Sequence, residues 1–236
     1  NLSKSYGKNR GIIDINLKIK EGEIFGFVGP NGAGKSTTIR TLLNFIFPTG
    51  GSGKILGMDI VKQSKDIKKQ IGYVPSEVKF YDEIKVKDII KYSCSFYDGI
   101  NQEDVDKLYE LLEVDVEKRM SELSLGNKKK VAIVQALIHK PRLLILDEPT
   151  NHIDSETIAW MENNLKSTTK ALLMVTHDRY FLDRVVNKTF ELDKGKIYVY
   201  QGNYGEFLEQ KAQREELAQA GERKRQNFLR TELEWV

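Results

Sequence analysis

The stretch GPNGAGKST, residues 29–37, constrains the fold of this chain more than any other part of its 236 residues. A short apolar run that favours strand, residues 23–29, leads into it, and apolar residues at helical spacing follow it as far as Ile46, before Pro48 interrupts the pattern. The glycines therefore join a predicted strand to a predicted helix. At such a junction backbone N–H groups and the helix N-terminus face an anion, and glycine lets the backbone come close to it. The stretch is predicted to be a phosphate-binding loop for ATP.

The side chains of this loop have separate predicted roles. Lys35 is expected to reach the β- and γ-phosphates of ATP, and Ser36 is expected to hold Mg2+. The other residues of the loop that are predicted to contact the nucleotide are Asn31, Gly32, Gly34 and Thr37. The predicted cofactors are therefore ATP and Mg2+.

Acidic partners for the metal follow a second apolar run. Residues 143–146 are all apolar and end in Asp147 and Glu148, which is typical of a buried parallel strand with carboxylates at its C-terminal end. Open α/β sheets bind ligands at that end, so Asp147 is expected to hold Mg2+ through water and Glu148 to polarise the attacking water. Another predicted strand, residues 171–178, brings His177 to the same rim, where it can donate a hydrogen bond to the γ-phosphate. Glu148 and His177 are the predicted catalytic residues.

Composition excludes several other classes of protein. No run approaches the roughly 18 consecutive apolar residues of a membrane span, and the N-terminus lacks the pattern of a signal peptide. The single cysteine, Cys94, excludes an internal disulfide, which fits a reducing cytoplasm. The 37 basic and 34 acidic residues are too balanced to indicate nucleic-acid binding by themselves. We therefore expect a cytoplasmic chain without direct membrane insertion.

Six motifs in order, along nearly the whole chain, resemble those of the ATP-binding cassette (ABC) ATPases: LSKSYG, the phosphate loop, ELSLGNKKKVAIVQALIHKP, LLILDEPT, NHID and VTHD. The resemblance implies an α/β P-loop NTPase fold. Its core sheet would be mainly parallel, with a small antiparallel β part near the N-terminus and a helical subdomain at about residues 77–140. The resemblance also implies that Tyr6 stacks on adenine and that Asp154 belongs to the nucleotide site.

Residues 123–127, LSLGN, correspond to the LSGGQ signature of the family. Ser124 and Gly126 match and would bind the γ-phosphate held by an opposite subunit, whereas Leu125 and Asn127 depart from the pattern. The resemblance thus implies an ATP-dependent head-to-tail homodimer. From the residues alone, Ser124 is also the predicted cap of the following helix. The three lysines after it, residues 128–130, are predicted to be a solvated charge run.

One motif is altered more seriously. Where the family usually has a glutamine after GYVP, this chain has Ser76 followed by Glu77. Serine is too short to reach as glutamine does, so Mg2+ coordination near Ser76 would need a water or Glu77. The expected consequence is slower hydrolysis without loss of nucleotide binding.

The two parts of the chain resemble different branches of the family. Residues 1–148 look like the ATPase subunit of a bacterial drug or lantibiotic exporter, and residues 149–236 look like the first cassette and linker start of an ABC-F protein. The chain is either a natural cassette with mixed features or a chimera joined within LLILDEPTN, and we favour the chimera, since the chain starts at Asn1 without methionine and stops within a linker. The predicted domains are an ATPase domain over residues 1–203 and a long, solvated, linker-like helix over residues 204–236.

The predicted activity is hydrolysis of ATP to drive a conformational change in a larger assembly. The favoured assembly is a membrane exporter, in which the chain would contact a transmembrane permease subunit at the inner face of the cell membrane. The alternative is an ABC-F-type translation factor that contacts the ribosome and tRNA, or an engineered fusion of the two kinds. A non-hydrolysing, ATP-gated scaffold is disfavoured because both Glu148 and His177 are present.

Overall fold

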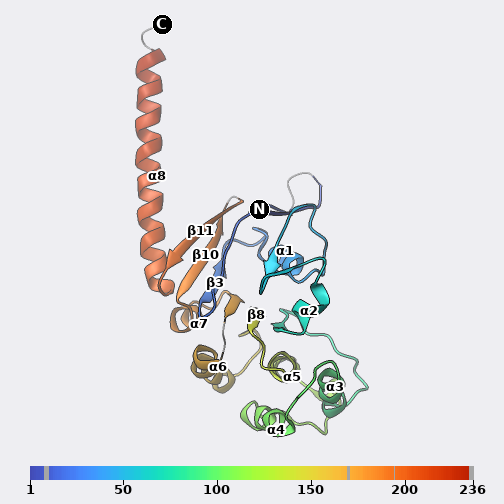
Figure 1. Ribbon diagram of the computed structural model, residues 1–236. Helices are drawn as coiled ribbons and strands as arrows, with labels where there is room; N and C mark the ends of the chain where they lie inside the picture. The colour runs from blue at the N-terminus through green and yellow to red at the C-terminus, as the bar shows by residue number, and fades with distance from the viewer. Residues whose placement is uncertain (8–10, 169–170, 194, 234–236) are drawn as a thin grey trace.

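A central sheet of six strands, in the order β11-β10-β3-β9-β8-β7, organises the chain in the computed structural model, which describes residues 1–7, 11–168, 171–193 and 195–233 (Figure 1). The pairs from β10 to β7 are parallel, and only the β10–β11 hairpin is antiparallel. The strands span Ile24–Val28 (β3), Ile71–Val74 (β7), Leu143–Asp147 (β8), Leu172–Val175 (β9), Lys188–Asp193 (β10) and Lys196–Gln201 (β11). The prediction of a mainly parallel α/β core is confirmed.

Alternate residues of the central strands face two different cores. In β8, Leu144 and Leu146 belong to one hydrophobic cluster and Ile145 to the other. In β9, Met174 belongs to the first of these clusters and Leu173 to the second. Because successive side chains of a strand point to opposite faces, a strand buried on both faces reads as an unbroken apolar run. This is the reason why β8 and β9 could be predicted from their runs of consecutive apolar residues.

Helices cover both faces of the sheet. Ile39 of α1, Lys35–Leu42, lies in one cluster, and the other cluster contains residues of α5, Leu125–Leu137, α6, Ser155–Thr168, and α7, Arg179–Val185. The helix predicted to continue from the phosphate loop to Ile46 is shorter than expected. It stops at Leu42 because Asn44 takes a left-handed conformation, with φ at 53°, which breaks the α-helical repeat.

A small antiparallel part lies at the N-terminal end, as predicted. Strands β1, Leu2–Ser5, β2, Gly11–Ile15, and β4, Gly50–Gly51, pair in the order β2-β1-β4. A separate ribbon, β5 and β6, leads to a short helix. These last elements span Lys54–Ile55 (β5), Met58–Asp59 (β6) and Ser64–Lys68 (α2).

Between β7 and β8 the chain is mainly helical, also as predicted. It forms α3, Val86–Cys94, α4, Gln102–Leu111, and a 3-10 helix, Met120–Glu122, before α5. In Figure 1, α3, α4 and α5 lie together at the end of the molecule opposite the free end of α8. Buried residues of all three helices belong to one cluster, to which β8 also contributes. The helical part is therefore packed on the core sheet through α5.

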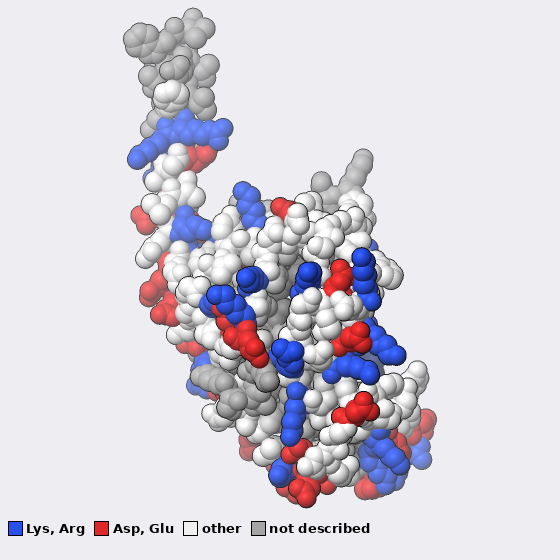
Figure 2. All heavy atoms as spheres, in the orientation of Figure 1, with Lys and Arg blue, Asp and Glu red and all other residues white. Residues whose placement is uncertain are grey.

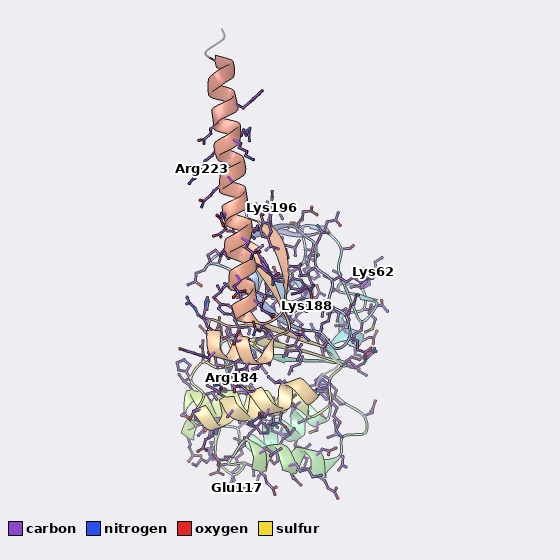
Figure 3. All side chains as sticks on the ribbon, turned by 90° about the vertical axis from the view of Figure 1, so that its left-hand side faces the viewer. Lys62, Glu117, Arg184, Lys188, Lys196 and Arg223 are labelled. Carbon is purple, nitrogen blue, oxygen red and sulfur yellow. The ribbon has the colours of Figure 1, made fainter. Side chains whose placement is uncertain are left out.

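The last helix, α8 (Tyr204–Leu233), projects from the body of the molecule (Figures 1 and 3). In Figure 3, Arg223 lies on its outer part, beyond the sheet that carries Lys196. The predicted long helix is confirmed over residues 204–233, Leu217 and Phe228 on its outer part are exposed, and residues 234–236 lie outside the described part. Figure 2 shows basic and acidic side chains interspersed over the visible face. None of the helices described is both long and apolar enough to cross a membrane.

The base of α8 is held on the sheet by a buried carboxylate. Glu191 of β10 accepts hydrogen bonds from the Tyr200 hydroxyl and from Arg214, both at 2.9 Å, and also pairs with Lys211. The Arg214 guanidinium lies 3.8 Å from the centre of the Tyr198 ring. Burial alone would raise the pKa of Glu191, but the contacts with Lys211, Tyr200 and Arg214 outweigh it and lower the pKa. A buried charge that is paired and hydrogen-bonded in this way fixes the orientation of the helix that supplies its partners.

Candidate functional site

The phosphate loop runs from the end of β3 to the first residue of α1. Gly34 precedes the helix with φ at 112°, and a Cβ on it would lie 2.5 Å from Cγ2 of Ile12, so both its conformation and its surroundings require glycine. The Lys35 ammonium folds back over the loop and donates to the carbonyl oxygens of Gly29 at 2.6 Å and Pro30 at 3.1 Å. The loop therefore places a cation and the N-terminus of α1 around one small space, which is the arrangement that phosphate requires.

The other predicted nucleotide contacts of this segment are arranged along the loop and the first turn of α1. Gly32 has φ at 80°, Asn31 and Ser36 are exposed, and Thr37 is half-buried. An exposed hydroxyl at Ser36 and a carboxylate at Asp147 are oxygen donors of the kind that Mg2+ prefers. The residues present therefore fit a magnesium ion that takes its remaining ligands from phosphates and water.

Two carboxylates lie at the end of β8, where the sequence predicted them. Asp147 is 2% exposed, and its burial raises the pKa of its carboxyl, an effect to which the charge of Glu148 adds and which Lys129 and Arg40 oppose. Burial lowers the pKa of Lys35, while the charges of Glu148 and Asp147 act in the opposite direction. Lys35 and the two carboxylates are therefore close enough to interact electrostatically.

Glu148 is held in an uncommon backbone conformation. Its φ is 49°, in the left-handed region that non-glycine residues rarely adopt, and its N–H donates to the carbonyl oxygen of Val175 at 2.7 Å. Its carboxylate accepts from the backbone N–H of His177 at 3.2 Å, and His177 Nε2 lies 3.5 Å from the other carboxylate oxygen. Strained residues of this kind are often found at active sites. The structure thus brings the two predicted catalytic residues together.

Two of the three lysines at residues 128–130, which were predicted to form a solvated run, are buried. The prediction is wrong for these two. Lys129 and Lys130 are 2% and 5% exposed, while Lys128 is half-buried and pairs with Asp82 on the surface. The reason is that α5 is covered on several sides, so that few of its positions face water. Burial lowers the pKa of Lys129 to about 8, against the opposing influence of Asp147 and Glu148. No local pattern in the sequence indicated this burial.

Ser76, in place of the usual glutamine, lies beside the acidic pair. It follows β7 and is half-buried, and the proximity of its side chain to Asp147 acts against the raised pKa of that carboxyl. Its backbone carbonyl, with that of Pro75, accepts from Lys129. The sequence identified Ser76 as a position of interest but did not reveal its lysine partner.

The signature residues form a second cluster, at the start of α5. Ser124 caps the helix, as predicted, by accepting from the N–H of Asn127 at 3.2 Å. Gly126 lies so close to the loop after Glu148 that a Cβ on it would be 2.3 Å from the carbonyl oxygen of His152. Asp154, in that same loop, pairs with Lys130 at 3.0 Å. No hydrogen bond or ion pair among the described residues joins this cluster to Lys35, so the predicted site residues fall into two groups.

A cavity of about 660 Å3 adjoins the phosphate loop. Its lining contains Asn31, Lys35 and His177 together with residues of α8, among them Phe207 and Lys211. Tyr6 does not line this cavity. It follows β1 directly and is 54% exposed, with the Lys4 ammonium 5.2 Å from the centre of its ring.

A family model described as ABC transporter matches residues 12–151, which is more than half of the chain. The chain belongs to the ABC transporter ATPase family. A second model with the same description matches residues 190–236, the segment that contains β11 and α8. The family predicted from the ordered motifs is thereby confirmed.

Relatives of two kinds match this cassette. YfmR of Bacillus subtilis, an uncharacterized ABC transporter ATP-binding protein, is 38% identical over 265 positions that include the whole chain and 42% of YfmR. The energy-dependent translational throttle protein EttA of Mycobacterium tuberculosis is 34% identical over 265 positions, with the whole chain and 47% of EttA covered. The bacitracin transport ATP-binding protein BcrA of Bacillus licheniformis is 34% identical over 203 positions, which cover 83% of this chain and 66% of BcrA. The cassette therefore spans less than half the length of YfmR and EttA.

None of these matches stops at the proposed junction near residue 148. YfmR and EttA match along the whole chain. The BcrA match covers 83% of the chain, which is longer than residues 1–148 or residues 149–236 alone. The matches with the transport protein BcrA and with EttA both extend across the junction. The chimera stays a prediction.

Solved structures share the fold. The ATP-binding subunit of an ABC transporter superposes with a TM-score of 0.78 at 24% identity, over 85% of this chain and 87% of that one. A dimeric post-hydrolysis state of an ATP-binding cassette bound to ADP and Pi superposes with a TM-score of 0.74 at 22% identity, over 85% and 96% of the two chains. At these identities the likeness establishes the cassette fold.

Proposed function

We propose that the cassette binds Mg-ATP and hydrolyses it to ADP and phosphate, with Glu148 as general base. The observation that carries the proposal is the contact between Glu148 and His177 beside the phosphate loop. In this mechanism Lys35 exchanges its two loop carbonyls for phosphate oxygens, and Glu148 accepts the proton of the attacking water. His177 donates a hydrogen bond to the γ-phosphate as its charge grows. Bound Mg2+, held through Ser36 and Asp147, would neutralise phosphate charge.

The second group of site residues favours a head-to-tail pair of cassettes. Ser124 and Gly126 lie at the N-terminus of α5, which has thirteen residues, and the Ser124 side chain is exposed. This end of α5 is free to meet an anion held by another chain. The solved cassette with ADP and Pi, which has the same fold, is dimeric, and this supports the proposal that two cassettes pair. We therefore propose that Ser124 and Gly126 complete the ATP site of a partner cassette, with Asp154 beside them, and that Tyr6 stacks on adenine.

The larger assembly that we propose is of the EttA type, in which ATP turnover acts on translation. Sequence reasoning alone favoured the exporter, and the extent of the matches reverses that order. YfmR and EttA match along the whole chain, including the part that folds as α8, whereas BcrA matches 83%. The base of α8 also forms one wall of the cavity that contains Lys35 and His177. Hydrolysis of the bound ATP could therefore change the position of α8, the helix that projects from the cassette. A linker that contacts the ribosome or tRNA would need such a coupling.

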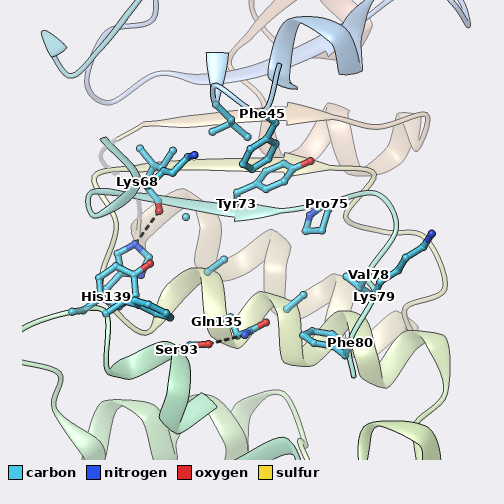
Figure 4. Close-up of a pocket in the computed structure, with 17 residues that line it drawn as sticks. Phe45, Lys68, Tyr73, Pro75, Val78, Lys79, Phe80, Ser93, Gln135 and His139 are labelled. Atoms are coloured by element: carbon cyan, nitrogen blue, oxygen red, sulfur yellow. Dashed lines mark hydrogen bonds between the residues drawn. The ribbon is translucent and has the colours of Figure 1, made fainter. Parts of the chain in front are cut away.

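An exporter subunit is the second candidate, and two observations favour it. The alignments with YfmR and EttA span 265 positions, 29 more than the 236 residues of the chain, so these proteins contain segments that the chain lacks, whereas the BcrA alignment of 203 positions needs few gaps. A groove of about 370 Å3 between β7, α3 and α5 has aromatic walls that include Phe45, Tyr73 and Phe80 (Figure 4). A helix of a permease subunit with an apolar face would fit such a groove.

The Glu148→Gln variant tests the activity. It should bind ATP like the wild type but turn it over at least about 100-fold more slowly, since the proton acceptor is weakened. Light scattering should show a dimer in saturating Mg-ATP and a monomer without nucleotide. Lys35→Ala, which lacks the phosphate-binding ammonium, is the matched control and should stay monomeric. A Glu148→Gln variant with wild-type turnover would refute the assignment of the base.

Co-sedimentation with ribosomes separates the two assemblies. The Glu148→Gln cassette should sediment with ribosomes in Mg-ATP and not in ADP, and Lys35→Ala should stay in the supernatant in both. If Glu148→Gln forms the ATP-dependent dimer but never sediments with ribosomes, the EttA-type proposal is wrong and the exporter candidate is favoured.

A further inference from the structure

The ammonium of Lys129 lies where three separate segments of the chain meet. It donates to the carbonyl oxygen of Pro75 at 2.6 Å, of Ser76 at 3.1 Å and of Asp147 at 3.4 Å. Lys129 belongs to α5, Pro75 lies just beyond the end of β7 (Figure 4), and Asp147 ends β8. Each of the three ammonium hydrogens has an acceptor. A buried charge is costly unless it is hydrogen-bonded, so these contacts stabilise the side chain in this position.

These contacts explain how a serine can reach the acidic pair. The Ser76 side chain lies close enough to Asp147 to lower the pKa of its carboxyl, although serine is shorter than the glutamine usual in the family motif. A short side chain can reach only if its own backbone lies close to the target. Lys129 binds the carbonyls of Pro75 and Ser76 on one side and the carbonyl of Asp147 on the other, and so joins the two backbones directly.

We infer that Lys129 is a positioning residue of the ATPase site, which holds residues 75–76 against the end of β8 so that the Ser76 hydroxyl reaches Asp147. Lys129 acts through these neighbours and does not touch the nucleotide. The inference rests on the proposed function for its kinetic consequence. Its structural consequence, a restrained loop at residues 75–76, can be measured without nucleotide or metal.

A role as a mere counter-charge would have the opposite effect on magnesium. Lys129 lies close enough to Asp147 and Glu148 to interact with both charges. If it only neutralised them, then replacing it with an uncharged residue would strengthen the attraction of the site for Mg2+. If it positions Ser76 and Asp147, the same replacement loosens the metal site, and changes to such supporting groups typically weaken metal affinity or activity about 10–100-fold.

Lys129→Met keeps the length of the side chain and removes both the charge and the donors. The Mg2+ concentration for half-maximal ATPase activity should rise about 10-fold, and ATP binding measured in EDTA should not change. Combining the change with Ser76→Ala should add little to either single change, because both disturb one contact. Lys128→Met is the matched control, since that lysine pairs with Asp82 at the surface, and it should leave the Mg2+ requirement unchanged. A lowered requirement in Lys129→Met would overturn the inference.

Limited trypsin digestion of the nucleotide-free protein provides the independent measurement. Lys79 is exposed just after the restrained segment, and Lys224 on the outer part of α8 provides an internal reference. Lys129→Met should speed cleavage after Lys79 at least about five-fold and leave cleavage after Lys224 unchanged, because only an opened loop fits the protease. Equal rates after Lys79, or equal acceleration at both sites, would overturn the inference even if the wild type proved not to hydrolyse ATP. Lys129→Gln serves in the same assays if the methionine variant does not fold.

Discussion

Gly126→Ala should uncouple nucleotide binding from turnover. A Cβ on Gly126 would lie 2.3 Å from the carbonyl oxygen of His152, whereas ordinary van der Waals contact of a Cβ begins at 3.4 Å. The start of α5 and the loop that holds Asp154 would have to separate by about 1 Å. The phosphate loop and the carboxylates of β8 are not part of this contact, so the ATP affinity of a single cassette should stay at the wild-type value.

The magnitude follows from two opposing effects. Forcing an extra methyl group into a packed contact typically costs about 1–3 kcal/mol of unfolding free energy, and replacing glycine by alanine in a helix returns up to about 1 kcal/mol. We expect a net loss of about 1–2 kcal/mol. Turnover should fall further, about 100-fold, because a 1 Å displacement of site residues can have an effect of that size on the rate.

Gly221→Ala is the matched control. Gly221 lies in α8 with nothing within 4 Å of the added carbon, so the same chemical change meets open space there. It should leave the ATPase rate unchanged. The measurements are urea denaturation, fluorescent-nucleotide binding and steady-state ATPase rate for both variants. If Gly126→Ala has the unfolding free energy and turnover of the wild type, then the close contact with His152 does not determine how the signature is placed.

Three further changes test other parts of the site. Lys35→Ala should raise the dissociation constant for ATP about 10–100-fold, because a charge-assisted bond to phosphate is lost, and equilibrium binding would show this. Ser76→Gln should raise the steady-state ATPase rate by restoring a longer side chain beside Asp147, and an unchanged rate would argue against that role. Burial alone would raise the pKa of Asp154, but hydrogen bonds from Thr157 and Lys130 lower it to about 2, below its value in the unfolded chain. Its contribution is therefore present at neutral pH and lost as the pH falls from about 4 to 2. Since the Asp154 side chain is 48% exposed, we expect Asp154→Asn to cost about 1 kcal/mol in urea denaturation at pH 7, and less at pH 3.

The parts of the fold that the sequence predicted are those that short-range chemistry determines. The strand before the phosphate loop, the glycine turn and the apolar runs of β8 and β9 each follow from residues that are neighbours in sequence. The cap at Ser124 was predictable for the same reason. The end of α1 could not be predicted. It depends on a left-handed conformation at Asn44, and the apolar spacing that continues to Ile46 does not indicate it.

The buried lysines could not be predicted because their partners are distant in sequence. Three consecutive lysines usually lie on a solvated surface, since an isolated buried ammonium is costly. The acceptors of Lys129 on the β7 loop are 53 and 54 residues away, and the carboxylate of Asp154 that pairs with Lys130 belongs to the loop before α6. Only the assembled fold brings these groups together.

The interleaving of the sheet limits how a fusion near residue 148 could have arisen. Strand β3 comes from the first part of the chain, but both of its neighbours, β9 and β10, come from the second part. Strand β8 likewise pairs with β7 on one side and with β9 on the other. The pairs Lys130–Asp154 and Glu148–His177 join the two parts again through side chains. Neither part could therefore complete a sheet or a site alone, and a junction is tolerable only between parents that share the strand order, the register and these pairs. Two parents of one family would share the strand order, because solved cassettes at only 22–24% identity already share this fold, and the Glu148–His177 pair is one that the proposed ATP chemistry requires in both.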